Sequence, residues 1–179
     1  NELRASLDGD ADRIVFYFFQ QGQFNILNGD YIAALVLTYL SKKLVKSDEK
    51  LTIGYVYTGY TNLACVNYVK SLSFPENVKL SCVCTATGVK NLHSEALKHD
   101  ISIYFESNGH GTVLFNKSYE NLKNLEVFFH PTVGDGIMDM FGILFILQEL
   151  NLTMYQWNDL YIDNPYHLFK MKVFDKSCF

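Results

Sequence analysis

The sequence predicts an α/β fold, a small mixed β-sheet flanked by helices, because strand-like and helix-like segments alternate along most of its length. The strand-like segments, rich in β-branched and aromatic residues, cover residues 51–57, 78–84 and 101–105. Segments with helical spacing of apolar residues lie between and around them. With 49% hydrophobic and 19% charged residues among 179, the composition favours a folded core over disorder.

The first 20 residues are expected to form a strand, a loop and a second strand, and neither strand has an evident partner nearby in the sequence. A turn at residues 28–30 then precedes a helix over residues 31–46, which is apolar on nearly every turn and basic only at its end. We expect Asp30 to cap this helix, and the terminal lysines suit the negative end of its dipole.

The rest of the chain alternates between helices and strands. Residues 101–105 and 112–115 are expected to form a hairpin around the loop 106–111. An extended segment over residues 166–174 leads away without closing the fold. The remaining helices are expected over residues 61–72, 92–99, 132–150 and 153–159.

Three carboxylates stand at every second position near the start of the chain: Asp8, Asp10 and Asp12, with only glycine and alanine between them. Small spacers let the backbone turn tightly enough for alternate side chains to point at one centre. Because three close carboxylates repel one another, a cation must lie between them, and Mg²⁺ prefers such oxygen ligands. An EF-hand calcium loop is excluded, since Arg13 and Phe19 stand where it needs glycine and glutamate. The remaining alternative is a solvated acidic turn.

Three segments resemble the α-D-phosphohexomutases, enzymes that interconvert sugar 1-phosphates and 6-phosphates. They are residues 8–13 (DGDADR), 87–93 (TGVKNLH) and 104–112 (YFESNGHGT), and they occur in the family's order. Asn108 stands where the glucose and mannose branches typically carry serine, so the third segment resembles the N-acetylglucosamine-phosphate branch. The resemblance extends over almost the whole chain.

The resemblance also implies a domain organisation. Residues 1–20 would be the C-terminal part of the family's second domain, with its metal-binding loop, and residues 21–165 the third, sugar-binding domain. Residues 166–179 would begin the connection to the fourth domain. The first domain with its phosphorylated serine, most of the second, and the fourth with its arginine-rich phosphate loop would lie outside this sequence. The chain by itself is therefore expected to be catalytically inactive.

Site roles follow from the same resemblance. Beside the three aspartates as Mg²⁺ ligands, the catalytic candidates are Arg13, Lys90 and His110. Arg13 could steady the transferring phosphoryl group, and Lys90 is a point charge suited to phosphate. His110 could transfer a proton or contact phosphate. For each of the three, a structural or solvated role is the alternative.

The substrate-binding candidates implied by the resemblance are Gly88, Glu106, Ser107 and Asn108. A carboxylate and an amide at alternate positions offer both acceptors and donors to sugar hydroxyls. The alternative for the last three is an ordinary polar hairpin turn, since Asn-Gly is a common hairpin dipeptide.

The activity implied by the resemblance is the Mg²⁺-assisted conversion of N-acetylglucosamine 6-phosphate to N-acetylglucosamine 1-phosphate. The route would pass through a phosphoserine and a bisphosphorylated sugar, and the product would supply UDP-N-acetylglucosamine biosynthesis. Two alternatives stay open. One is phosphoglucomutase or phosphomannomutase activity, against which Asn108 argues. The other is a non-enzymatic module that binds a metal or a sugar phosphate.

Charge, hydropathy and cysteine content exclude some classes of protein and indicate a cellular location. The net charge of −4 argues against a nucleic-acid-binding protein. The longest apolar run, residues 31–40, is about half of what a membrane span needs. None of the four cysteines belongs to a Cys-x-x-Cys pair, so we expect free thiols, with Cys82 and Cys84 buried. Free thiols and the lack of a recognisable signal peptide favour a cytoplasmic location.

Overall fold

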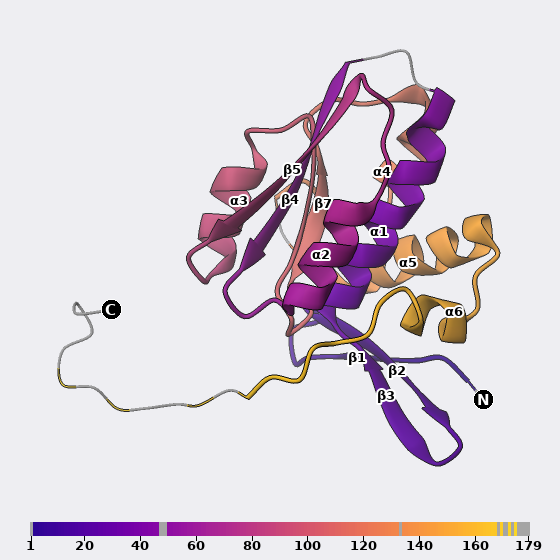
Figure 1. Ribbon diagram of the computed structural model, residues 1–179, viewed down its shortest axis with the longest axis vertical. Coiled ribbons are helices and arrows are strands. Elements are labelled where there is room, and N and C mark those ends of the chain that lie inside the picture. The colour runs from indigo at the N-terminus through magenta and orange to yellow at the C-terminus, as the bar shows by residue number, and fades with distance from the viewer. Residues whose placement is uncertain are drawn as a thin grey trace.

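The structure, a computed structural model, describes residues 2–46, 50–132, 134–167, 169, 172 and 174. Its larger sheet has four strands in the order β5-β4-β6-β7. The central strand β4 (Leu51–Thr58) pairs in parallel with β5 (Val78–Thr85) and with β6 (Ile101–Phe105). The last strand, β7 (Gly111–Phe115), pairs antiparallel with β6. The mixed α/β sheet and the hairpin predicted from the sequence are therefore confirmed (Figure 1).

Helices cover both faces of this sheet (Figure 1). On one face, α1 (Gly29–Lys43) packs against β6, and α2 (Leu63–Ser71) packs against α1 and β5. On the other face, α3 (Val89–Ala96) covers a small separate core that includes Leu92 and Tyr104. The other helices are η1 (Leu44–Lys46), η2 (Glu120–Leu122), α4 (Lys123–Glu126), α5 (Gly136–Leu150) and α6 (Met154–Asn158).

The central element is α1, which is buried on all sides from Gly29 to Ser41. A helix without a polar face belongs inside a core, and the apolar run in the sequence explains this position. The N-cap is Asn28, whose Oδ1 accepts hydrogen bonds from the N–H groups of Asp30 and Tyr31. The expectation that Asp30 caps α1 is therefore wrong, because Asn28 already occupies that position. Asp30 lies in the first turn instead.

A second, three-stranded antiparallel sheet is formed by β1 (Arg4–Leu7), β2 (Ile14–Gln20) and β3 (Gln23–Leu27). The expectation that the first strands lack a nearby partner is wrong, since β1 pairs with β2 and β2 with β3. Both residues of the β2–β3 turn, Gln21 and Gly22, have positive φ, as in the tight turns that suit a β-hairpin. The proposed division of the chain at residue 20 stays a prediction.

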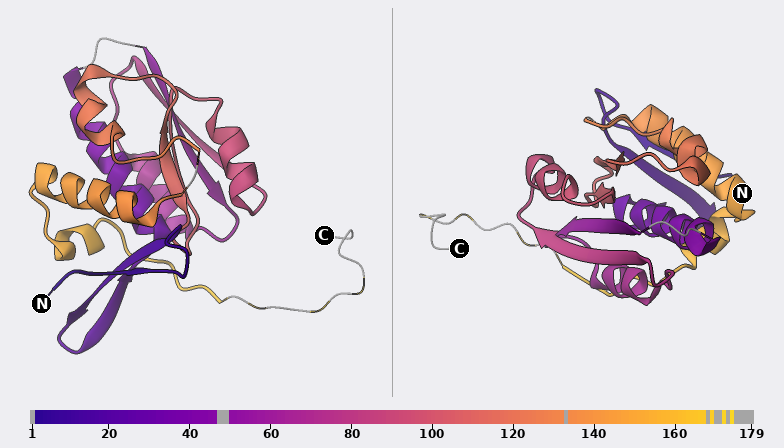
Figure 2. Two further views of the ribbon diagram at one scale, coloured as in Figure 1. Left: turned by 180° about the vertical axis from the view of Figure 1, so that it is seen from behind. Right: turned by 90° about the horizontal axis from the view of Figure 1, so that it is seen from above.

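The three-stranded sheet of β1, β2 and β3, here called the N-terminal sheet, is connected to α1 through contacts with α5 and α6. These two helices lie at the same end of the molecule as the sheet (Figure 2). The chain has one tryptophan, Trp157 in α6, and it is fully buried. Its ring meets Phe16 of β2 edge-on with centroids 5.2 Å apart, and its Nε1–H donates to the Tyr31 carbonyl oxygen at 2.9 Å. One side chain thus joins β2, α1 and α6.

Three of the four cysteines are described, and all three are free thiols. Cys65 is buried and Cys82 is half-buried, but Cys84 is exposed, which contradicts the expectation for that residue. Cys178 and part of the predicted extended segment, residues 168, 170–171 and 173, lie outside the described residues. Among the helices that are described, none is long and apolar enough to cross a membrane.

Candidate functional site

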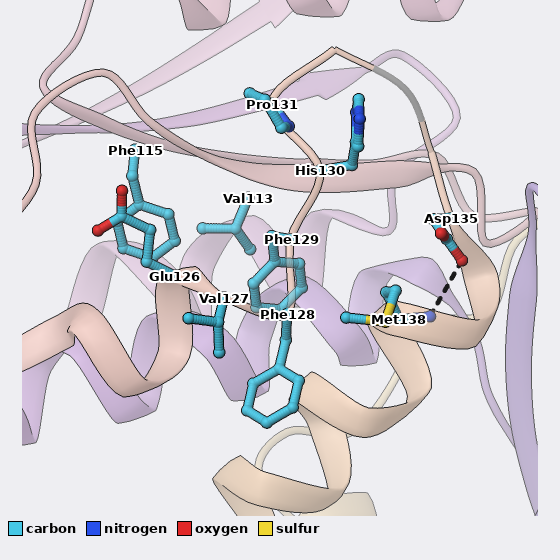
Figure 3. Close-up of a pocket in the computed structure, with 10 residues that line it drawn as sticks. All are labelled: Val113, Phe115, Glu126, Val127, Phe128, Phe129, His130, Pro131, Asp135 and Met138. Atoms are coloured by element: carbon cyan, nitrogen blue, oxygen red, sulfur yellow. Dashed lines mark hydrogen bonds between the residues drawn. The ribbon is translucent and has the colours of Figure 1, made fainter.

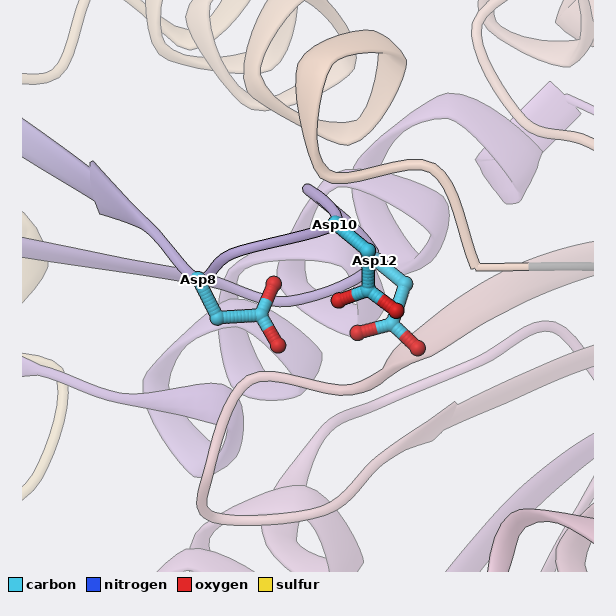
Figure 4. A group of neighbouring side chains, drawn as sticks. All are labelled: Asp8, Asp10 and Asp12. Atoms are coloured by element: carbon cyan, nitrogen blue, oxygen red, sulfur yellow. The ribbon is translucent and has the colours of Figure 1, made fainter.

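The loop between β1 and β2, here called the metal loop (residues 8–13), gathers the three predicted metal ligands (Figure 4). Ala11 adopts a φ of 59°, in the left-handed region, and its N–H donates to the Asp8 carbonyl oxygen at 3.3 Å. This tight turn places one carboxylate oxygen each from Asp8, Asp10 and Asp12 within 4.8 Å of one another. The alternating spacing of the sequence therefore does converge the three side chains.

The donor set fits a hard divalent cation. Asp8 and Asp10 are exposed and Asp12 is half-buried. Oδ1 of Asp12 is buried and accepts no hydrogen bond from the described residues, so this oxygen has an unused lone pair. Three carboxylate ligands would leave other positions of an octahedral Mg²⁺ open to water or to a phosphate oxygen.

Arg13 partly neutralises the metal loop. Its Nε lies 3.4 Å from Asp8 Oδ2 and 3.5 Å from Asp12 Oδ1, and its backbone N–H donates to Asp8 Oδ1 at 3.3 Å. Desolvation acts to raise the pKa of Asp8, but hydrogen bonds from Arg13 and Asp12, with the Arg13 charge, lower that pKa below its ordinary value. Because these groups are solvated, the ion pairs orient the loop more than they stabilise the fold.

Two backbone contacts join the metal loop to the turn of the β6–β7 hairpin, here called the hairpin turn (residues 106–110). The Ile14 N–H donates to the Gly109 carbonyl oxygen at 3.2 Å, and Arg13 forms an isolated antiparallel bridge with His110. This approach leaves His110 Nε2 at 3.5 Å from a carboxylate oxygen of Asp12. The predicted metal ligands and the predicted sugar-binding turn therefore lie against each other, although about ninety residues separate them.

Glu106 and Asn108, both in the hairpin turn, are held in different ways. Glu106 Oε1 accepts a hydrogen bond from the Gly88 N–H at 3.2 Å, which connects the hairpin turn to the start of α3. Gly88 has a φ of 106°, a conformation that favours glycine. Asn108 is exposed, and its Oδ1 accepts from the His110 N–H at 3.0 Å. Within the described part of the chain, the amide group of Asn108 donates no hydrogen bond and remains available to a ligand.

Lys90 and Ser107, two further predicted site residues, differ in how far other residues of the protein engage their side chains. Lys90 is exposed in the first turn of α3, close in sequence to Gly88, and forms no ion pair with any described residue. The Ser107 hydroxyl donates to Asp30 Oδ1 at 3.1 Å, with the Tyr60 carbonyl oxygen at 3.5 Å as a second acceptor. Its single proton is therefore committed inside the protein, and a direct role in substrate binding stays a prediction.

Asp30 is a residue beside the site for which the sequence suggested only a capping role. It is 2% exposed, and desolvation raises its pKa to about 6, with a smaller contribution from Asp163. Hydrogen bonds from Asn62 and Ser107 oppose this rise. The signal in the sequence was an acid at the start of an otherwise apolar helix.

This raised pKa predicts how stability depends on pH. The folded protein favours the neutral carboxyl of Asp30, and this preference adds to the free energy of unfolding. The contribution is complete below pH 3.8, the ordinary pKa, and is lost as the pH rises through about 6. The Asp30→Asn variant lacks this titration. Relative to that variant, the wild-type chain should lose about 3 kcal/mol of unfolding free energy between pH 3.5 and pH 7. Urea unfolding at several pH values measures the difference, and two parallel stability curves would contradict the assignment.

The start of α5 contacts the metal loop through two glycines that sequence reasoning missed. The Gly136 N–H donates to the Ala11 carbonyl oxygen at 2.8 Å. A Cβ on Gly134 would lie 2.9 Å from the Asp12 carbonyl oxygen. Small residues on either side of Asp135, just before a long apolar helix, were the available signal. They allow α5 to approach the metal loop closely.

Two pockets lie near these elements, and the larger is not the one beside the acidic residues. A cavity of about 390 Å³ lies between β7 and the start of α5 (Figure 3). Its walls are mostly apolar, and its carboxylates are already engaged. Glu126 accepts from the Ser118 hydroxyl, while Asp135 caps α5. A smaller cavity of about 240 Å³ is lined by Asp8, Arg13 and Asn108, among others, and therefore connects the metal loop with the hairpin turn.

The chain is similar to several known proteins. The family model described as phosphoacetylglucosamine mutase AMG1, domain III, matches residues 28–126. A phosphoacetylglucosamine mutase of Sus scrofa is 39% identical over an alignment 197 residues long, gaps included. This alignment covers 99% of this chain and 35% of the relative. The solved structure of Aspergillus fumigatus N-acetylphosphoglucosamine mutase in complex with GlcNAc-6P and magnesium superposes with a TM-score of 0.87 at 35% identity. That superposition covers 98% of this chain and 36% of the other.

A phosphoglucomutase/phosphomannomutase family protein of Burkholderia thailandensis is only 16% identical. Its TM-score is 0.58, over 89% of this chain and 29% of the other, so it shows the fold alone.

A mixed α/β sheet with an aspartate loop and a polar hairpin turn at one end defines a part of an α-D-phosphohexomutase, the superfamily of the similar solved structures. Within that class, the chain belongs to the phosphoacetylglucosamine mutase family. It spans about a third of the length of the curated relatives that it matches.

Proposed function

We propose that this chain is part of an enzyme that interconverts N-acetylglucosamine 6-phosphate and N-acetylglucosamine 1-phosphate with Mg²⁺. The supporting observation is the contact between the metal loop and the hairpin turn, through Ile14 with Gly109 and Asp12 with His110. Such a contact would hold a phosphate of the sugar near the metal while polar side chains bind its hydroxyls. The relative from Aspergillus fumigatus, solved with GlcNAc-6P and magnesium, supports this assignment.

In this proposal Asp8, Asp10 and Asp12 hold the metal ion. Bound there, Mg²⁺ would neutralise charge on the equatorial oxygens of the transferring phosphoryl group. Arg13 lies beside the same carboxylates and would donate hydrogen bonds to that group. His110 would hold or pass a proton at its Nε2, which faces Asp12.

The hairpin turn would select the sugar. Glu106 offers acceptor oxygens to sugar hydroxyls, and Asn108 offers amide donors that are unpaired within the described residues. Gly88 would orient Glu106 through its N–H, and Lys90 at the start of α3 would attract the distal phosphate.

The complete reaction would need a nucleophile from elsewhere in the full-length protein. A phosphoserine would pass its phosphoryl group to the free hydroxyl of the sugar phosphate, giving a bisphosphate, and would recover the other phosphoryl group after the sugar turns over. The sequence of this chain contains no serine loop of that kind, so the chain by itself is expected to be inactive. In the cell the product would supply UDP-N-acetylglucosamine synthesis in the cytoplasm, without nucleic-acid or membrane partners.

A domain division follows from the same proposal. Residues 2–27, which form the three-stranded sheet, would complete the second domain, and the match to domain III begins at residue 28. This division moves the predicted boundary from residue 20 to the end of β3. Residues up to about 165 would form the third domain, with 166–179 leading to the fourth.

Phosphorus NMR of the full-length protein with N-acetylglucosamine 6-phosphate and Mg²⁺ tests the proposed function. We expect the 1-phosphate to appear, no reaction after removal of Mg²⁺ by a chelator, and at least about tenfold slower reaction with glucose or mannose 6-phosphate. A preference for glucose or mannose phosphates would support the phosphoglucomutase or phosphomannomutase alternative. Binding of the sugar phosphate without turnover would support a non-enzymatic module.

A further inference from the structure

A buried carboxylate lies directly behind the hairpin turn, in the first turn of α1. Asp30 is 2% exposed, and its two oxygens have separate partners. Oδ1 accepts from the Ser107 hydroxyl at 3.1 Å, and Oδ2 accepts from the Asn62 N–H at 2.9 Å. The carboxyl group thus connects the hairpin turn with the residue that caps α2.

The backbone of α1 is seated against the hairpin turn at the same place. The Gly29 N–H donates to the Ser107 carbonyl oxygen at 3.5 Å. A Cβ on Gly29 would lie 1.9 Å from the Glu106 carbonyl oxygen, so only glycine permits this approach. Ser107 is therefore held through both its backbone and its side chain, and it stands between Glu106 and Asn108.

The hydrogen-bond chain continues to the segment that follows α6. Asn62 Oδ1 accepts from the Asn164 N–H at 3.1 Å, and its Nδ2 donates to the Asn164 carbonyl oxygen at 3.0 Å. Asp30 therefore lies in the middle of a continuous series that runs from Ser107 to Asn164. Its position couples the hairpin turn to elements that are distant in sequence.

The cost of burying this carboxylate argues for a role beyond α1. Asn28 already caps the helix, so Asp30 is not needed there. No lysine or arginine among the described residues forms an ion pair with Asp30, and the nearby charge of Asp163 is repulsive. An apolar residue would avoid this cost, but it would leave the Ser107 hydroxyl and the Asn62 N–H without their acceptor.

We propose that Asp30 is the positioning residue of the hairpin turn. Its carboxylate fixes Ser107 and thereby sets where Glu106 and Asn108 stand relative to the metal loop. The inference rests on the proposed function, because that function assigns the sugar to this turn. Asp30 touches no substrate and acts through Ser107. Because this turn would bind sugar hydroxyls that do not react, it would hold the sugar equally in the ground state and the transition state. Loss of the link should therefore raise KM and spare kcat.

The test measures kcat and KM for N-acetylglucosamine 6-phosphate with full-length wild-type protein and its variants. Asp30→Ala and Ser107→Ala should each raise KM about tenfold, with kcat within about threefold of wild type. The double variant should be no worse than either single variant, because both remove the same link. The Mg²⁺ concentration for half-maximal activity should stay within about twofold.

Asp30→Asn provides a conservative rescue. Its Oδ1 can accept from the Asn62 N–H while its Nδ2 donates to the Ser107 oxygen, so KM should stay within about threefold of wild type. If Asp30→Ala fails to fold, Ser107→Ala and Asp30→Asn still decide the question. A merely structural role would not give this split between KM and kcat.

Asp139→Asn is the matched control. Asp139 is 1% exposed in the first turn of α5, and its Oδ2 accepts no hydrogen bond within the described part of the chain. Its KM should equal that of wild type. An active wild-type protein whose KM is unaffected by Ser107→Ala, or variants that lose kcat alone, would overturn the inference. A wild-type protein without turnover would instead overturn the proposed function, and the inference with it.

Discussion

Replacing Asp10 with asparagine in the full-length protein should lower Mg²⁺-dependent turnover on the order of a thousandfold. Asp10 is exposed, and it forms no hydrogen bond or ion pair within the described residues, unlike Asp8 and Asp12, which contact Arg13. Its carboxylate is therefore free to serve the metal alone. Without Mg²⁺ the Asp10→Asn variant should unfold at the same temperature as wild type or slightly higher, because one repulsive charge has been removed.

A metal ligand is identified by a loss of turnover that occurs without a loss of stability in the absence of Mg²⁺. Steady-state kinetics over a Mg²⁺ titration, with thermal unfolding in the presence and absence of Mg²⁺, should show lost activity and lost stabilisation by the metal. Asp159→Asn, at an exposed aspartate just after α6, controls for the change of surface charge. Turnover within about tenfold of wild type, with unchanged Mg²⁺ dependence, would show that Asp10 is not a ligand.

The second large effect is expected from Gly109→Ala, which should destabilise the chain by at least about 3 kcal/mol. Gly109 has a φ of 89°, and its Cβ would lie 2.0 Å from the Ile14 carbonyl oxygen and 3.0 Å from the Ile14 nitrogen. No flexible side chain can yield there, so the hairpin turn would have to move away from the metal loop. The contact between the two halves of the site would then be lost.

Gly22→Ala is the matched control for this prediction. Gly22 has a similar φ of 81°, but nothing lies within 4 Å of its added Cβ. That variant should therefore show only the cost of the backbone conformation, about 1 kcal/mol. Urea unfolding of both variants measures the difference. Equal losses would mean that the approach of Gly109 to Ile14 is not what holds the hairpin turn.

Local patterns predicted the parts of the site that depend on local sequence. The alternation of Asp8, Asp10 and Asp12 was sufficient to expect converging carboxylates, since side-chain direction follows from residue spacing. The contact between the metal loop and Gly109 was not predictable from physics alone, because it depends on how two sheets pack. The link from Asp30 to the hairpin turn was missed for the same reason, since its partners Asn62 and Ser107 are brought to it only by the tertiary fold.

The secondary structure, too, was predicted well in some segments and missed in others. The strands and helices of the four-stranded sheet were predicted to within a few residues, because their apolar periodicity is long and regular. The strand Gln23–Leu27 was missed, since it is short and follows a turn whose Gln21 is not a usual residue for positive φ. Glu120–Leu122 and Lys123–Glu126 were missed because single helical turns leave almost no periodic signal.

The intrinsic fluorescence of Trp157 can report on the packing around this residue. The indole is the one such group in the chain, so fluorescence excited selectively at the red edge of the absorption band comes from a single place. The indole is fully buried, and it contacts Phe16 of the N-terminal sheet and the backbone carbonyl of Tyr31 in α1. Separation of these elements would admit water and shift the emission to longer wavelength, even while the larger sheet stayed intact. The spectrum therefore reports whether the N-terminal sheet, which carries the metal loop, still packs against α1 and α6.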